Sequence, residues 1–252
     1  VIAGQGTIGL EILARDPAPD AIVTPVGGGG LIAGIGCAVK ERFPQIEMIG
    51  VQTSRLPSMQ VALQRGQPVS LPAESTLADG IAVRKAGILT LPLVRKYVDR
   101  IVTVEEDEIA AAILLLLESE KTLAEGAGAI ALAAVLHSKT GHRGKKIVVL
   151  VSGGNLDVNV LSRIIERGMV RDGRRLRLRV RLPDHPGALE GLASVIAKAS
   201  ANIVETLHNR AHYGVSLSET AIDITMETRG SAHVAELLGA LRDAGYEFDV
   251  VE

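Results

Sequence analysis

The sequence predicts an α/β protein in which an open parallel sheet is followed by a small antiparallel sheet with helices on one face. Two observations predict this. In residues 1–168, short apolar segments alternate with segments of helical periodicity, and such strand–helix–strand units place their strands in parallel. From Leu176 onward, apolar and basic residues alternate one by one, which is the period of a half-exposed strand. We therefore expect domains at 1–168 and 176–252, joined by a polar linker at 169–175.

The composition is that of a soluble globular protein. Of the 252 residues, 47% are hydrophobic and 22% are charged, and the formal net charge is -2. This charge gives no reason to expect nucleic acid or an anionic membrane as a partner. The longest apolar run, Ile109 to Leu117, is far shorter than the ~20 residues that a membrane-spanning helix needs. A single cysteine, Cys37, excludes a disulfide framework and favours a reducing compartment such as the cytoplasm.

The chain opens inside a helical pattern. It begins with Val1 and not with methionine, and Ile8, Ile12 and Leu13 already share one helical face. We therefore expect the start to be a cut in a longer protein.

The first domain should contain four strands and four further helices. Short β-branched or apolar runs predict strands at 21–26, 46–52, 101–104 and 146–151. Helical periodicity, an acidic first turn at 106, an alanine-rich segment and the breakers Pro44 and Gly168 predict helices at 31–43, 106–120, 127–138 and from 155 to 167.

The second domain reads as a strand, a helix, two strands, a helix and a strand. The expected strands are 176–182, 202–209, 218–228 and 247–251, and the expected helices are 189–199 and 232–244. This order is the ferredoxin-like arrangement, in which two helices back an antiparallel sheet.

Four consecutive glycines, Gly27 to Gly30, separate the strand at 21–26 from the next helix. Without Cβ atoms, this backbone can approach a ligand closely and adopt positive φ. The amides of Gly28 to Leu31 would point outward at a helix N-terminus, where the dipole favours an anion, most simply a phosphate. The alternative is a flexible turn, although a turn rarely needs four glycines. The spacing matches neither the dinucleotide fingerprint nor the lysine-bearing P-loop.

A second loop, Ser152-Gly153-Gly154-Asn155, follows the strand at 146–151. Ligands of open α/β sheets bind at the carboxyl ends of the strands. A phosphate cradle and a serine at two strand ends would suit a ligand with an anionic group at one end and a polar ring atom at the other. The alternative is a strand-to-helix turn in which Asn155 caps the helix, and the loop by itself leaves both open.

Five motifs occur in an order and spacing that resemble one enzyme family. They are Gly4-Gln5-Gly6-Thr7 with Glu11, Gly27-Gly28-Gly29-Gly30-Leu31, Leu77-Ala78-Asp79-Gly80, Glu125-Gly126-Ala127-Gly128 and Ser152-Gly153-Gly154-Asn155. Residues 1–167 resemble the threonine ammonia-lyase and serine racemase branch of the fold-type II pyridoxal-phosphate (PLP) enzymes, which have the fold of the tryptophan synthase β chain. Residues 176–252 resemble an ACT domain through Asp184-His185-Pro186-Gly187-Ala188-Leu189 and Ala201-Asn202-Ile203.

The resemblance implies roles for individual residues. Gly27, Gly28, Gly29, Gly30 and the amide of Leu31 should bind the PLP phosphate. Ser152 should hydrogen-bond the pyridine nitrogen, and a serine cannot keep that nitrogen protonated as a carboxylate would. Glu125 and Asp79 should lie near the site, and a simple turn cap is the alternative for Asp79.

Two departures from the family pattern affect the prediction. The Ser-x-Lys-x-Arg-Gly segment that carries the family's PLP-bound lysine has no match here, and neither has its Ser-Ser-Gly-Asn-His segment. We therefore expect the chain alone to be inactive. Gln52 and Ser58 occupy the positions that align with the acidic cation ligands of serine racemases, which argues against a metal site and a racemase.

The expected activity of the intact parent is deamination of L-threonine, and also of L-serine, to 2-oxobutanoate or pyruvate and ammonia. The alternative is a non-catalytic fragment that binds amino acids or partners.

In the second domain, Gly187 and Asn202 should bind an amino-acid effector, and isoleucine or valine is the first candidate because the resemblance points to branched-chain biosynthesis. We also expect a homo-oligomer, since small domains with exposed sheet edges gain by association.

Overall fold

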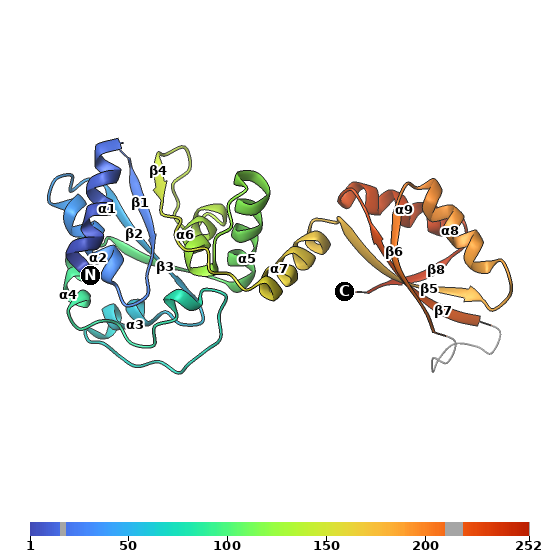
Figure 1. The fold of residues 1–252 in the computed structure, drawn as a ribbon, viewed down its shortest axis with the longest axis horizontal. Coiled ribbons are helices and arrows are strands. Elements are labelled where there is room, and N and C mark those ends of the chain that lie inside the picture. Colours follow the sequence, from blue (N-terminus) through green and yellow to red (C-terminus); the bar gives the residue numbers. More distant parts are fainter. Residues whose placement is uncertain (16–18, 210–218, 252) are drawn as a thin grey trace. The chain divides into compact units, whose positions relative to one another are not determined.

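The computed structural model describes residues 1–15, 19–209 and 219–251. The chain divides into two compact units, Val1–Ile164 and Ile165–Glu252, and the division lies within helix α7 (Val158–Arg171) (Figure 1). Within the described part of the chain, none of the helices is both long enough and apolar enough to span a bilayer.

The first unit is built on a four-stranded sheet in which every strand pair is parallel, as the sequence predicted. The strands lie in the order β3-β2-β1-β4, and their bounds are β1 Ala21–Pro25, β2 Glu47–Thr53, β3 Arg100–Val104 and β4 Ile147–Val149. Strand β1 is buried throughout, because a parallel sheet is covered by helices on both faces and its inner strands are apolar on both sides.

Helices cover the two faces of this sheet (Figure 1). Helix α2 packs against β1 and β2 and is flanked by α1 and α4, while α6 packs against β1, β2 and β3 and is flanked by α5. The bounds are α1 Ile2–Arg15, α2 Gly30–Lys40, α3 Ser58–Arg65, α4 Thr90–Tyr97, α5 Glu106–Leu115 and α6 Gly126–Leu136.

Helices α1 and α2 approach closely because small residues line their contact. A Cβ atom placed on Gly34 of α2 would lie 2.3 Å from the carbonyl oxygen of Ile2 and 2.8 Å from the amide nitrogen of Gly6. Both of these are backbone atoms of α1, so a larger residue at position 34 would force the helices apart.

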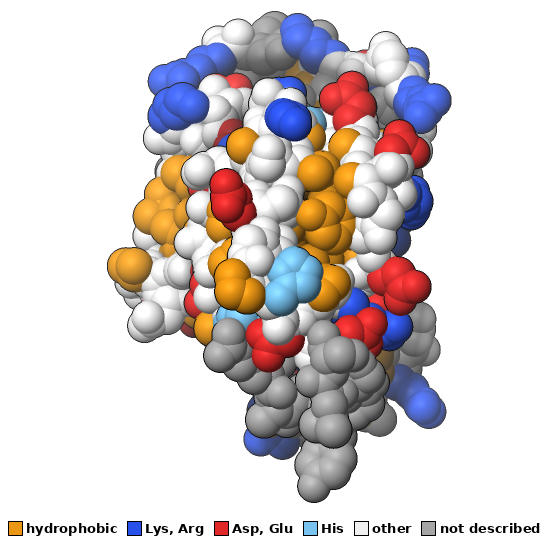
Figure 2. Space-filling model, turned by 90° about the vertical axis from the view of Figure 1, so that its right-hand side faces the viewer, with side chains coloured by type: hydrophobic (Ala, Val, Ile, Leu, Met, Phe, Trp, Pro, Cys, Tyr) orange, Lys and Arg blue, Asp and Glu red, His pale blue; other side chains and the backbone are white. Residues whose placement is uncertain are grey.

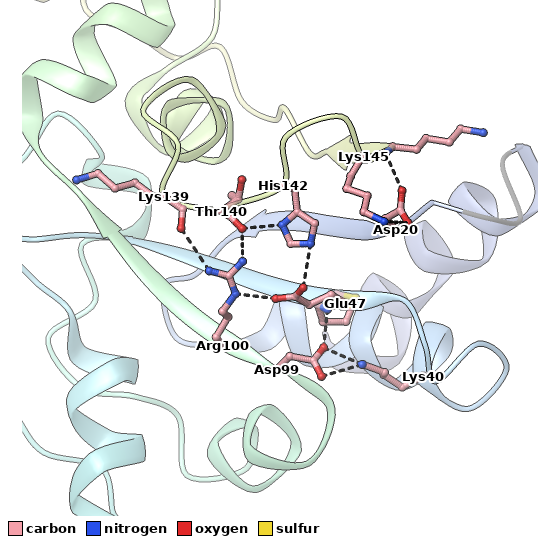
Figure 3. A network of polar contacts seen from close by, with 11 residues as sticks. Asp20, Lys40, Glu47, Asp99, Arg100, Lys139, Thr140, His142 and Lys145 are labelled. Atoms are coloured by element: carbon pink, nitrogen blue, oxygen red, sulfur yellow. Dashed lines mark hydrogen bonds and ion pairs between the residues drawn. The ribbon is translucent and has the colours of Figure 1, made fainter.

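Ion pairs join the amino ends of the strands (Figure 3). Glu47 of β2 bonds Arg100 of β3 at 2.6 Å and the ring of His142, in the segment before β4, at 2.9 Å. Asp99 bonds Lys40 at the end of α2 at 2.7 Å. These contacts fix the sheet at the amino ends of its strands. They do not involve the loops at the carboxyl ends.

The second unit is an antiparallel sheet with strand order β6-β7-β5-β8. Its elements are β5 Arg175–Pro183, α8 Ala188–Lys198, β6 Asn202–Asn209, β7 Glu219–Glu227, α9 Ser231–Asp243 and β8 Glu247–Val250. This is the expected ferredoxin-like topology, although the first residue of the predicted strand 218–228 lies outside the described residues.

The alternation predicted from Leu176 is present in β5. Leu176, Leu178 and Val180 are buried, and the arginines between them lie on the other face. There Arg179 makes two hydrogen bonds to Asp223, of 2.7 and 2.9 Å, and these bonds raise the pKa of Arg179. Asp223 is only 5% exposed, so the pair satisfies a carboxylate that is buried on this face.

Several sequence-based boundaries were wrong. Gly168 does not end its helix, because α7 continues to Arg171, and the linker expected at 169–175 is therefore helical in its first part. The helix expected at 106–120 is α-helical only to Leu115 and continues as a π-helical turn. Helices α3 and α4 were missed, since each has only 8 residues and too few turns to show a clear period.

The α1–α2 contact gives a stability prediction with an internal control. Gly34→Ala should destabilise the first unit by about 1–3 kcal/mol, because its methyl group would meet backbone atoms. Gly239→Ala should stabilise the second unit by about 0.5–1 kcal/mol, since position 239 lies inside α9 with no atom within 4 Å of an added Cβ. Urea unfolding of each variant measures the change in its free energy of unfolding. Equal effects of the two substitutions would contradict the close packing of α1 against α2.

Candidate functional site

Two loops leave the carboxyl ends of adjacent strands. Strands β1 and β4 pair in parallel with Val23 opposite Val149, so the glycine run after β1 and the serine loop after β4 begin at the same edge of the sheet. The connection from β1 to β2 passes through α2 on one face, and the connection from β3 to β4 passes through α5 and α6 on the other. Such a reversal is the place where open α/β sheets bind ligands.

The glycine run, residues 27–30, ends at the N-terminus of α2. Gly29 is the N-cap with a φ of 89°, a conformation that favours glycine. The amides of Gly28, Gly29, Gly30 and Leu31 donate to no acceptor among the residues that the structure describes. A Cβ on Gly29 would lie 2.4 Å from Cε of Met59. Free amides on a loop without side chains form a cradle that fits a phosphate group.

The segment around Asp79 lies between the two loops. A Cβ on Gly27 would lie 3.2 Å from Cα of Ile81, and a Cβ on Gly80 would lie 3.2 Å from Oε1 of Glu125. Asp79 is exposed, and its carboxylate accepts the amide of Gly80 at 2.8 Å. Asp79 is the first residue of a short 3-10 turn, Asp79–Ile81, whose N-cap is Ala78 and has no side-chain hydrogen bond. This turn places Gly80 against Glu125.

Glu125 holds the serine loop, residues 152–155. It stands at the N-cap position of α6, and its Oε2 accepts the amide of Asn155 at 3.1 Å. Its own amide donates to the carbonyl oxygen of Gly153 at 3.1 Å. The Ser152 carbonyl packs so closely on α6 that a Cβ on Gly128 would overlap it, at 1.5 Å.

Ser152 itself is exposed, and its hydroxyl has no hydrogen-bond partner in the described part of the chain. Asn155 does not cap the following helix, as the alternative interpretation required. Helix α7 begins at Val158, and Asp157 caps it by accepting the amides of Asn159 at 2.7 Å and Val160 at 3.3 Å. Glu125 therefore binds the serine loop, and a different residue, Asp157, caps the helix that follows it.

Glu106 anchors the segment before Asp79 and was not singled out from the sequence. Its carboxylate accepts hydrogen bonds from the hydroxyl of Thr76 at 2.6 Å, the amide of Leu77 at 2.6 Å and the hydroxyl of Thr53 at 3.0 Å. Because Glu106 begins α5, this residue looked like an ordinary acidic residue in a helical first turn.

Gln52 has a structural role at the position where the resemblance suggested a cation ligand in racemases. It is 1% exposed. Its Oε1 accepts the amides of Met59 at 3.1 Å and Gln60 at 3.0 Å, and its Nε2 donates to the Val26 carbonyl at 3.2 Å. No group of three or more potential metal-binding His, Cys, Asp or Glu side chains occurs in residues 1–15, 19–209 and 219–251.

The two residues expected to bind an effector in the second unit do not meet in one chain. Gly187, with a φ of 90°, precedes α8 and lines a cavity of about 360 Å³ with residues that include His185, His208 and Thr220.

Asn202 pairs with Glu227, whereas the other end of β7 pairs with Pro183. A single copy therefore holds Asn202 at the far end of the sheet, where its side chain bonds Glu227 at 3.1 Å. Figure 2 shows hydrophobic side chains gathered among charged ones on one side of this unit.

Known relatives share both the sequence and the fold. Over the whole chain, identity is 48% to an L-threonine ammonia-lyase of Thermotoga maritima and 48% to one of Geobacter sulfurreducens. The chain spans 62% and 63% of the lengths of these relatives. A threonine deaminase isoform from Solanum lycopersicum, 36% identical, superposes with a TM-score of 0.62 over 65% of this chain and 48% of its own. Maize serine racemase, 34% identical, gives a TM-score of 0.60 over 68% of this chain and 53% of its own.

The family model for pyridoxal-phosphate dependent enzymes matches residues 1–153, which include the glycine run and the first two residues of the serine loop. The free amides at α2 and the start of the loop after the adjacent β4 lie within this match. The chain therefore belongs to the family of pyridoxal-phosphate dependent enzymes.

Proposed function

We propose that this chain is the part of an L-threonine ammonia-lyase that binds the PLP phosphate, with L-threonine, and also L-serine, as substrates of the intact enzyme. The products would be 2-oxobutanoate or pyruvate, and ammonia. The observation that carries the proposal is the set of unpaired amides from Gly28 to Leu31, at the same edge of the sheet as the serine loop. The names of the relatives at 48% identity support the choice of substrate.

The proposed division of work follows from the site. The amides of the glycine run would hold the phosphate, aided by the dipole of α2. PLP, when bound, supplies an electron-withdrawing ring that favours loss of the α-proton and of the β-hydroxyl from a bound amino acid. The hydroxyl of Ser152 would meet the pyridine nitrogen without keeping it protonated. A weaker electron sink suits β-elimination, in which the negative charge at the α-carbon is short-lived.

The lysine that binds PLP covalently would come from a segment outside this chain. The lysines of this chain lie at positions 40, 85, 96, 121, 139, 145, 146 and 198, and none occurs in a Ser-x-Lys-x-Arg-Gly context. We therefore propose that the chain by itself binds the cofactor noncovalently and does not deaminate threonine.

A chimera tests the proposed function. The region of the Thermotoga maritima relative that precedes its match to this chain would be fused to residues 1–252. We expect this protein to release ammonia and 2-oxobutanoate from L-threonine, because the fusion joins the lysine-bearing segment to the glycine run. The unfused chain should release neither.

Two results would decide against it. One is a folded chimera that binds PLP and deaminates neither L-threonine nor L-serine. The other is a Gly29→Val chimera that keeps full activity, because valine at a φ of 89° beside Met59 should destroy the cradle. Gly4→Ala is the matched control, since an added Cβ at position 4 meets nothing within 4 Å.

Glu125→Ala should release the serine loop. The Asn155 amide loses its acceptor, and loss of a hydrogen bond to a charged group costs about 1.5–3 kcal/mol locally. Amide hydrogen exchange at Asn155 should therefore become about 10-fold faster or more. Glu190→Ala, on the exposed first turn of α8, is the control. Unchanged exchange at Asn155 would show that Glu125 does not hold this loop.

For the second unit, we propose an ACT regulatory domain that binds an amino acid, with isoleucine or valine as the first candidate. The cavity beside Gly187 could receive a carboxylate on the amides at the start of α8. Asn202 could contribute only from a second copy, since one copy holds it at the opposite end of the sheet. Binding and association of two copies should therefore be linked.

Calorimetry and sedimentation of the chain test this proposal. We expect isoleucine or valine to bind and to favour the dimer, and Gly187→Val or Asn202→Ala to weaken both effects. Each variant should lose about 10-fold in affinity. Asn202→Ala removes one hydrogen-bonding group of a charged ligand, and valine at position 187 disfavours the φ of 90° that shapes the turn before α8. A monomer that binds none of isoleucine, valine, threonine and serine would refute the proposal.

A further inference from the structure

Two side chains far away in the sequence donate hydrogen bonds to carbonyl groups within and just before the glycine run. The carbonyl oxygen of Gly28 accepts the hydroxyl of Thr90 at 2.5 Å and the amide of Gly87 at 3.3 Å. The carbonyl of Val26, just before the run, accepts Nε2 of Gln52 at 3.2 Å. Both contacts come from the side of α3 and α4, which is also where Met59 packs against Gly29.

A fixed carbonyl determines the direction of the next amide. The peptide unit is planar and trans, so its C=O and N–H groups point in opposite directions. With the Gly28 carbonyl turned toward Thr90, the N–H of Gly29 must point away from α4. By the same reasoning, the bond from Gln52 to Val26 turns the N–H of Gly27 away from Gln52. The hydrogen bonds from Gln52 and Thr90 therefore orient two peptide units. One joins Val26 to Gly27, and the other joins Gly28 to Gly29.

Thr90 is suited to this task by its place and chemistry. It is the first residue of α4 and is 9% exposed, so water competes little for the Gly28 carbonyl. Its hydroxyl carries one proton, and the Gly28 oxygen at 2.5 Å is nearer than the Gly87 oxygen at 3.1 Å. The approach requires a glycine at position 87, where a Cβ would lie 2.6 Å from the Thr90 hydroxyl oxygen.

We propose that Thr90 is a positioning residue for phosphate binding, because it holds the glycine run with its free amides facing the ligand, and that Gln52 supports it at Val26. The proposal rests on the phosphate site proposed above. It adds a residue that would act through the Gly28 carbonyl and that lies 62 positions from Gly28 in the chain.

The test compares Thr90→Val and Thr90→Ala, which remove the hydroxyl, with Thr90→Ser, which keeps it. The probe is 4-deoxypyridoxine 5′-phosphate, which has no aldehyde and cannot react with surface lysines. We expect the affinity of the chain to fall about 3- to 10-fold in the valine and alanine variants, the range for one lost hydrogen bond. Thr90→Ser should stay within about twofold of wild type. Thr7→Val, which removes an exposed hydroxyl bonded to the Gly4 carbonyl, is the control.

A second measurement needs no ligand. NMR order parameters of the Gly28, Gly29 and Gly30 amides should fall in Thr90→Val and return in Thr90→Ser, because the anchor limits fast motion of the run. If the wild-type chain binds the probe and both hydroxyl-free variants bind it equally well, the role of Thr90 is refuted while the phosphate site stands. If the wild-type chain does not bind the probe, the phosphate site is wrong and the positioning role falls with it.

Discussion

The parallel pairing of β1 with β4 is the constraint on which the site depends. These strands are far apart in the sequence, yet the register Val23 to Val149 brings the ends of both to one edge. The connection that leaves β1 runs through α2 on one face of the sheet, and the connection that enters β4 runs through α5 and α6 on the other. Open α/β sheets bind ligands at such a reversal. At the other edge, Glu47 forms an ion pair with Arg100 and contacts the ring of His142, and these contacts join the amino ends of the strands.

Side chains from neighbouring elements form hydrogen bonds with the backbone of both loops. Glu125 fixes the serine loop, and Thr90 and Gln52 hold the carbonyl groups of the glycine run. Glu106 ties the intervening segment through Thr76 and Leu77. The amides from Gly28 to Leu31, which would meet a phosphate, are left unpaired among the described residues. Such preorganisation reduces the ordering cost of binding.

The sequence was most informative where composition and geometry are directly linked. Four glycines before a helix predicted the loop at the N-terminus of α2, and continuous apolar runs predicted the parallel strands, because both patterns have few structural solutions. The contacts of Thr90 and Gln52 could not be predicted, since they depend on pairing between elements distant in the chain. The separation of Asn202 from Gly187 was likewise invisible until the register of β5, β6 and β7 was known. Gly168 misled the prediction because a glycine that is buried within α7 looks like a helix end.

The central claim is that the amides from Gly28 to Leu31 form the phosphate site. The most direct measurement is an NMR titration of the isotope-labelled chain with inorganic phosphate, followed at every backbone amide. The largest shifts should occur at Gly28, Gly29, Gly30 and Leu31, whose N–H groups have no acceptor among the described residues, and sulfate should produce the same pattern. Saturable shifts confined to the arginine-rich face of β5, or no saturable shift at residues 28–31, would contradict the claim.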